Sequence, residues 1–199
     1  MMTQAIAGFR AIKSAMQARI VGKMRLDSES QNYTAPKTMP KAEFRSKADE
    51  INVRLARPGD AARIAGFNNA MAMETESRAL AEETVCAGVE AVFSTDKIGF
   101  YVVAEHAGEI VGALMVTYEW SDWRNGFFWW FQSVYVEPKY RRQGIYRLLY
   151  EFVALRARAA GNVYGFRLYV EKNNAIAQSV YANLGMSETD YLMFEQRLG

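Results

Sequence analysis

The sequence predicts an α/β (α+β) protein in which helices cover both faces of a mixed β-sheet. From residue 51 onward, runs of β-branched and aromatic residues are interspersed with segments whose apolar residues recur every three or four positions. The first pattern is typical of strands and the second of amphipathic helices. In chain order they give strand, two helices, three strands, helix, strand, helix and strand, which places helices on both sides of one sheet.

The first part of this region predicts two helices between a strand and a hairpin. Residues 51–56 (INVRLA) alternate in polarity and precede the turn residues RPGD, so they predict a strand. Asp60 is a good N-cap for a helix over residues 61–73, and a second helix is expected over residues 81–94. Residues 100–120 give the strongest hairpin signal, because two β-branched runs flank a turn, AEHAGE, that contains glycine.

The second part contains one long aromatic strand and two helices that end at glycine. Residues 127–136 (FFWWFQSVYV) predict a strand that ends before Pro138. Residues 145–161 have helical periodicity and end at Gly161, a plausible residue for a helix C-terminus. The remaining expected elements are a strand over residues 163–170, a helix over residues 173–185 and a last strand over residues 191–198.

The first 50 residues differ from the rest, with nine Lys and Arg against five Asp and Glu. Residues 1–25 are basic with helical apolar spacing, which predicts an amphipathic helix, and residues 26–50 predict a polar linker. We therefore expect an extension over residues 1–50 and one domain over residues 51–199. The extension is either a segment that packs on the domain or frays in solution, or an organelle-targeting presequence. The protein is expected in the cytoplasm in the first case and in an organellar matrix in the second.

Charge and sulfur content exclude several classes of function. The net charge of +2 is too small to indicate nucleic-acid binding. No apolar run reaches the ~18–20 residues that a membrane span needs, so stable membrane insertion is not expected. Cys86 is the only cysteine, so no intrachain disulfide forms, which fits a reducing compartment. Cys86 and His106, far apart in sequence, predict neither a metal site nor a Cys–His nucleophile pair.

The stretch YRRQGIYRLLY, residues 140–150, predicts an anion site at the start of a helix. The first turn of a helix leaves N–H groups unpaired and carries positive potential. Gly144 has no side chain to keep a phosphate away from those groups, and Lys139, Arg141 and Arg142 add positive charge. The glycine motifs of nucleoside triphosphatases and dinucleotide-binding folds are missing. A solvated basic helix start would give the same local pattern.

Two segments together resemble the GCN5-related N-acetyltransferase (GNAT) family. Residues 141–146 (RRQGIY) are similar to its acyl-CoA pyrophosphate motif, Gln/Arg-x-x-Gly-x-Gly/Ala, and residues 174–186 resemble its downstream element Asn-x-x-Ala-x-x-x-Tyr-x-x-x-Gly-Phe/Met. The two motifs lie ~30 residues apart with the expected strand between them, and the order of elements over residues 51–199 also matches. The resemblance implies a GNAT-like three-layer fold with a mixed central sheet of about six to seven strands.

The resemblance also implies an activity. The protein would transfer an acetyl group from acetyl-CoA, a co-substrate, to a primary amine by direct attack, without a metal. The acceptor would be a small cationic amine or a peptide amino group, and a backbone N–H in residues 134–136 would hold the oxyanion. Two other readings stay open, namely a non-catalytic acyl-CoA-binding regulatory module and an interaction unit that acts through the N-terminal segment. A homodimer is also left open.

By the same resemblance, three features would hold the cofactor. The strand before the motif would pair with the pantetheine arm, the motif's amides would hold the diphosphate, and Asn174 would hydrogen-bond the arm, unless it only caps its helix. Position 146 departs from the family pattern, because it holds tyrosine where a small residue is usual. The expected cofactor-binding residues are Val134, Tyr135, Val136, Arg141, Arg142, Gln143, Gly144, Ile145, Tyr146, Arg147 and Asn174.

The expected catalytic residues are a phenol and a carboxylate. Tyr181 matches the position from which many family members protonate the leaving thiolate, and a packing role is the alternative. The base that deprotonates the amine would be Glu119 or Asp122, from the aromatic stretch EWSDWR, with Glu74 and Glu76 as the alternative. Each of these acids also fits a solvated surface charge. The tryptophans beside Glu119 and Asp122 suit an ammonium substrate through cation–π attraction.

Overall fold

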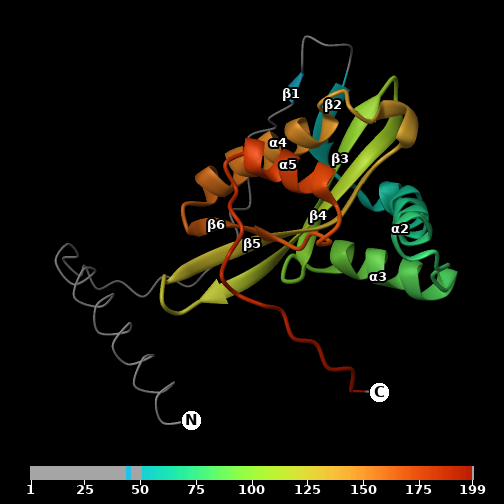
Figure 1. Ribbon diagram of the computed structural model, residues 1–199. Coiled ribbons are helices and arrows are strands. Elements are labelled where there is room, and N and C mark those ends of the chain that lie inside the picture. Colours follow the sequence, from blue (N-terminus) through green and yellow to red (C-terminus); the bar gives the residue numbers. More distant parts are fainter. Residues whose placement is uncertain (1–43, 46–50, 199) are drawn as a thin grey trace. The chain divides into compact units, whose positions relative to one another are not determined.

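The computed structural model describes residues 44–45 and 51–198. The chain divides into two units, Met1–Lys37 and Thr38–Gly199, and every described residue belongs to the second. The expected helix within residues 1–25 lies outside the described residues. The strands and helices in Figure 1 are β1 (Phe44–Arg45), β2 (Ile51–Leu55), α2 (Ala61–Glu76), α3 (Glu82–Ser94), β3 (Gly99–His106), β4 (Glu109–Ser121), β5 (Gly126–Val136), α4 (Ile145–Ala160), β6 (Val163–Leu168) and α5 (Ala175–Asn183), with short 3-10 turns at Pro58–Asp60 and Pro138–Tyr140.

The strands form one mixed sheet, as predicted, and their order in the sheet is β1-β2-β3-β4-β5-β6. Neighbours from β1 to β5 are antiparallel, and β5 and β6 are parallel. The predicted hairpin is formed by β3 and β4, which pair from Gly99 opposite Thr117 to His106 opposite Glu109. A tight turn cannot join parallel strands, so α4 makes the crossover from β5 to β6.

Alternation along β3 explains how the three layers are held together. Val102 and Ala104 pack with the α4 residues Leu149 and Phe152 on one face of the sheet. Tyr101 and Val103, which alternate with them along β3, pack on the other face with α2 and α3. Figure 1 shows α2 and α3 on one side of the sheet and α4 on the other. Successive side chains of a strand point to opposite faces, so one strand contributes to both cores.

The two ends of the described chain differ from the sequence prediction. Residues 191–198, expected as the last strand, form neither strand nor helix, and Tyr191, Phe194 and Leu198 are 81%, 90% and 94% exposed. Their apolar pattern favours a strand only where a partner edge pairs with it, and the pairing described for β6 is with β5 alone. The sixth strand is instead β1, which pairs with β2 ahead of residue 51.

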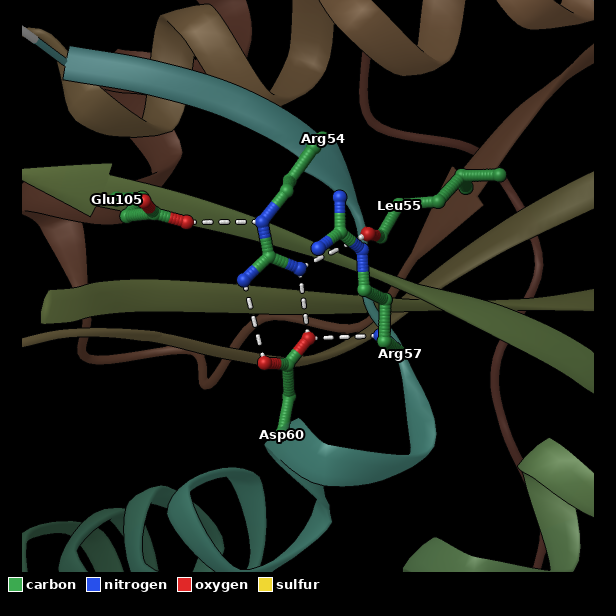
Figure 2. A network of polar contacts seen from close by, with 5 residues as sticks. All are labelled: Arg54, Leu55, Arg57, Asp60 and Glu105. Atoms are coloured by element: carbon green, nitrogen blue, oxygen red, sulfur yellow. Dashed lines mark hydrogen bonds and ion pairs between the residues drawn. The ribbon is translucent and has the colours of Figure 1, made fainter. Parts of the chain in front are cut away.

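The turn between β2 and α2 is held by ion pairs rather than by a side-chain cap. Asp60 stands at the N-cap of α2, but its side chain makes no capping hydrogen bond to the helix. Its carboxylate accepts hydrogen bonds from the Arg57 amide and from Arg54 Nη1, both at 2.7 Å (Figure 2). Arg54 Nε also donates to Glu105 Oε2 at 2.8 Å, which ties the turn to β3. Asp60 therefore occupies the predicted N-cap position of α2, but its carboxylate bonds the turn and Arg54 instead of the helix.

None of the helices in the described part of the chain has the length and apolarity to cross a membrane.

Candidate active site

The sheet opens between its two parallel strands. β5 pairs with β6 from Phe127 opposite Val163 to Phe131 opposite Leu168, and the described pairing ends there. β5 continues to Val136, so the backbone of residues 132–136 has no described strand partner on that side. Unpaired N–H and C=O groups in a row accept another extended chain, although the Val136 carbonyl at the end of this edge already accepts a hydrogen bond from Arg141 Nε at 2.8 Å. The predicted cofactor-binding residues Val134, Tyr135 and Val136 line this open strand edge.

A bulge bends β5 at the same point. Met115 of β4 pairs with Gln132 and Ala113 pairs with Tyr135, so Ser133 and Val134 together oppose the single residue Leu114. Ser133 has φ 48°, a left-handed conformation that is uncommon for a residue other than glycine. A bulge of this kind turns the strand and re-aims its side chains and amides. The opening of the sheet thus coincides with a local distortion of β5.

The loop after β5 leads into helix α4, whose N-terminus has no side-chain cap. Gly144 is the N-cap of α4 with φ 79°, and within the described chain no side chain caps this helix. A Cβ built at Gly144 would meet no atom within 4 Å, so the surface above it is open. The side chain of Ile145 is buried in the core, which leaves its backbone amide as the group it can offer. Unpaired amides and the helix dipole make this a fitting anion site.

The charged side chains of the loop have separate partners. Arg141 Nη2 lies 2.7 Å from Glu74 Oε2, and Arg141 Nε donates to the Val136 carbonyl at 2.8 Å. Arg147 is paired with Glu151 at 2.8 Å. The side chain of Arg142 is exposed, and no ion pair is described for it. Arg141 therefore fixes the loop against β5 and α2, whereas the Arg142 side chain stays exposed beside the start of α4.

Gln143 and Lys139 stiffen the same loop. Gln143 Nε2 donates to the Lys139 carbonyl at 3.1 Å, and Lys139 Nζ lies 3.8 Å from Glu137 Oε2. Glu137 is also paired with Arg63 of α2. Two ion pairs, Arg63–Glu137 and Glu74–Arg141, therefore connect α2 to the loop.

Tyr146, the departure from the family motif, points between α4 and α5. Its ring packs against the α4-side core and lies 5.6 Å from the ring of Tyr181, edge to face. Its hydroxyl is buried, and no hydrogen-bond partner is described for it. Burial raises the pKa of Tyr146, and the neighbouring Tyr181 raises it further. The bulky side chain is thus packed inward, against the core and Tyr181.

α5 brings two predicted residues beside α4. The Asn174 side chain accepts a hydrogen bond from the Ala177 amide at 3.0 Å, so Asn174 caps α5. Its Oδ1 is thereby used, and its amide nitrogen remains as a donor for a ligand. Tyr181 lies later in α5, against Tyr146 of α4, and burial raises the pKa of its phenol above the ordinary value of 10.0.

The first two carboxylate candidates lie along the hairpin of β4 and β5. Glu119 accepts hydrogen bonds from Trp130 Nε1 and Arg167 Nη1, each at 2.5 Å, one on each carboxylate oxygen. Asp122 lies in the turn and accepts from the Trp123 amide at 2.9 Å. Seven strand positions separate Gly126 from the bulge at Ser133, about 23 Å at ~3.3 Å per residue. The structure therefore does not bring Asp122 to the opening of the sheet.

Glu74 is the carboxylate that the fold does bring there. It lies in the last turn of α2 and accepts a hydrogen bond from the Tyr135 hydroxyl at 3.0 Å, directly beyond the bulge. Burial, and then this hydrogen bond, raise the pKa of Tyr135. Glu76 is exposed at the end of the same helix, and no hydrogen bond is described for it. No local pattern indicates the contact of Glu74 with Tyr135, because 61 residues separate the two in sequence.

Known proteins share this architecture. A family model described as the acetyltransferase (GNAT) family matches residues 69–186. A solved structure of a "possible acetyltransferase" from Clostridium difficile 630 is 42% identical, with a TM-score of 0.70, and the match covers 75% of this chain and 99% of that one. The comparison with curated proteins found none that matches.

Two more distant structures are similar in fold. One is a predicted acetyltransferase from Clostridium acetobutylicum solved with acetyl-CoA, at 16% identity, TM-score 0.63, and coverage of 73% of this chain and 96% of that one. The other is AAC(6')-Iy in complex with a CoA bisubstrate analogue, also at 16% identity and TM-score 0.63, with coverage of 75% and 99%. The matched region of the family model, residues 69–186, contains the open edge of β5, the helix start at Gly144 and α5. The chain therefore belongs to the GNAT family of acetyltransferases.

Proposed function

We propose that this protein transfers the acetyl group of acetyl-CoA to the nitrogen of a primary amine. The observation that carries the proposal is the continuity of two ligand sites. The open edge of β5 over residues 132–136 leads, through one short loop, to the uncapped start of α4 at Gly144. An extended amide-containing arm that ends in a diphosphate matches both sites at once, and coenzyme A has that form.

Different residues would bind different parts of the cofactor. The backbone of Val134, Tyr135 and Val136 would pair with the pantetheine arm. The amides that follow Arg142 at the start of α4 would hold the diphosphate, with the Arg142 guanidinium beside them. The side-chain amide of Asn174 would donate to the arm from α5.

The chemistry is direct attack at the thioester carbonyl. The amine nitrogen forms the new C–N bond, and the oxyanion is held by a backbone N–H at the bulge of β5. The C–S bond then breaks, and the thiolate takes the proton of the Tyr181 phenol. Because burial raises the pKa of that phenol, it carries its proton at neutral pH. The phenolate regains a proton from solvent, and the products are the acetylated amine and free coenzyme A.

We assign the base to Glu74, directly or through one water molecule. Both carboxylates are paired, Glu119 with Trp130 and Arg167 and Glu74 with Tyr135 and Arg141, but only Glu74 lies beside the bulge where the thioester would sit. Glu74→Gln should lower kcat/KM about 10²–10⁴-fold at neutral pH, which is the usual contribution of a general base. The activity should recover in part as the pH rises, because the acceptor then carries less of its own proton. Glu76→Gln, two residues away, is the matched control, and a loss in Glu74→Gln that does not vary with pH would remove Glu74 from this role.

Release of free thiol from acetyl-CoA in the presence of a panel of primary amines tests the function itself. Thiol release that depends on an amine, together with an acetylated product, supports the proposal. Coenzyme A binding without turnover of any amine would contradict it. That result would favour a non-catalytic acyl-CoA-binding regulatory module.

A further inference from the structure

The face of the sheet that α2 and α3 cover extends past these two helices. In that uncovered part it carries polar and aromatic side chains. Phe127, Trp129 and Phe131 of β5 pack toward α4. The residues between them, Phe128, Trp130 and Gln132, point to the opposite face. Trp130 and Gln132 are partly exposed there, together with Thr117 and Glu119 of β4 and Arg167 of β6. This polar face continues along β5 to the bulge at Ser133, where the acetyl group would lie.

Arg167 is fixed on this face by contacts with two neighbouring strands. Its Nη1 donates to Glu119 Oε1 at 2.5 Å, and its guanidinium carbon lies 3.7 Å from the centre of the Phe128 ring. Glu119 is held in turn by Trp130 Nε1 at 2.5 Å. Stacking on a ring that is 8% exposed, together with an ion pair at its edge, sets the plane of the guanidinium.

Stability does not account well for this arrangement. The side chains of Arg167 and Glu119 are 33% and 38% exposed, and ion pairs at such exposure contribute little to folding. A guanidinium has five N–H donors, and the hydrogen bonds described for Arg167 use Nη1 alone. A rigid guanidinium with donors to spare, at a partly exposed site, is suited to a planar two-oxygen anion.

We propose that the acetyl acceptor carries a carboxylate, which Arg167 binds while the amine lies at the bulge of β5. This inference rests on the proposed acetyl transfer. A carboxylate fits better than a phosphate, because the charge of Glu119 would repel a dianion more strongly. The amine and the carboxylate are the two ends of one acceptor that lies along the polar face of β5.

The strand itself gives the distance between the two ends. Arg167 lies above Phe128, and four to five strand positions lead from Phe128 to Gln132 and Ser133, about 13–16 Å at ~3.3 Å per residue. The reach of the side chains shortens this span to roughly 10–14 Å, the length of an extended peptide of about three or four residues. A single α-amino acid is too short to reach both ends. The acceptor class is therefore a short peptide, acetylated on its N-terminal amine.

Oligoglycines of increasing length, each as the free acid and as the C-terminal amide, test this inference. For the wild-type protein, kcat/KM should favour acid over amide about tenfold or more for triglycine and tetraglycine, as for other hydrogen bonds to charged groups. Glycine and diglycine should show no such preference. Equal rates for acid and amide at every length would overturn the inference, although turnover of the amides would leave the acetyltransferase activity established. No turnover of any amine would overturn both.

Variants of the two arginines separate recognition from packing. Arg167→Met should abolish the preference for the acid while retaining turnover of the amides, and Arg167→Lys, which keeps the charge without the planar fork, should retain part of the preference. Arg124→Met is the matched control, because the Arg124 guanidinium also lies near the Phe128 ring, at 5.3 Å, and no ion pair is described for it. An equal loss of preference in Arg124→Met and Arg167→Met would show that bulk charge, not Arg167, selects the acceptor.

Discussion

Two phenols, Tyr146 and Tyr181, meet between α4 and α5 and illustrate how single residues depart from a motif. The sequence shows that tyrosine replaces a small residue at position 146, but not where its side chain points. The structure places the ring inward, with its hydroxyl buried and no partner described. An unsatisfied buried hydroxyl costs about 1–3 kcal/mol, so the side chain is tolerated rather than favoured by folding. Its ring lies edge to face against the ring of Tyr181.

The phenol of Tyr181 should control the departure of the thiolate. Tyr181→Phe is expected to lower kcat about 10²-fold, because the leaving sulfur loses its proton donor, while the Kd of coenzyme A stays nearly unchanged. Burial raises the pKa of Tyr181 above 10.0, so the wild-type kcat should not fall through this group at any pH below 10. Pre-steady-state and steady-state rates over pH would measure both effects. Full turnover by the Phe variant would assign Tyr181 to packing alone.

At the scale of elements, ion pairs hold both ends of helix α2 against neighbouring elements. Its start is joined to β2 and β3 through Asp60, Arg54 and Glu105, and its end to the loop between β5 and α4 through Glu74 and Arg141. The sequence predicts that α2 begins after Asp60, because the turn residues and the spacing of the apolar residues are local signals. It does not report either set of ion pairs, because their members lie on separate elements that meet only when the sheet forms.

The Asp60 carboxylate should make stability depend on pH. Burial alone would raise its pKa, but hydrogen bonds from Arg54 and from the Arg57 amide bring it below the ordinary 3.8. A carboxyl with a lowered pKa in the folded state stabilises the fold above the pKa of the unfolded chain, and this contribution is lost as the pH falls through the folded value. Asp60→Asn should therefore cost about 1–3 kcal/mol at neutral pH and less below pH 3.8.

Urea unfolding at a series of pH values would measure this effect. Asp96→Asn, an exposed aspartate for which no ion pair is described, is the matched control and should change little at any pH. A cost of Asp60→Asn that is the same at acidic and neutral pH would show that the charge of Asp60 does not contribute.

For the whole molecule, the sequence predicted the helix and sheet layers better than it predicted where the strands of the sheet pair and end. The hairpin of β3 and β4, the crossover helix α4 and the helix start at Gly144 were all visible as local patterns, and the structure contains them. The last strand over residues 191–198 was wrong, because its apolar pattern needs a neighbouring edge that the sequence cannot supply. The sheet opening at Phe131 and the bulge at Ser133 were also not visible, since both depend on which strands pair and where pairing stops.

The pairing of β5 with β6 ends at Phe131, so the rest of β5 lacks a strand partner on that side. A ligand that hydrogen-bonds to this edge would take the place of the missing strand and stabilise the folded chain. By mass action, a ligand that binds only the folded chain adds about 2.7 kcal/mol to the free energy of unfolding at one hundred times its Kd, and the melting temperature rises with the logarithm of the free ligand concentration. Calorimetric scans with rising coenzyme A should show this trend in the wild type. Gly144→Glu places a negative charge at the N-terminus of α4, so the melting temperature of this variant should not change with the coenzyme A concentration. A protein of this build would be more resistant to heat in a cell rich in acyl-CoA than in a starved one.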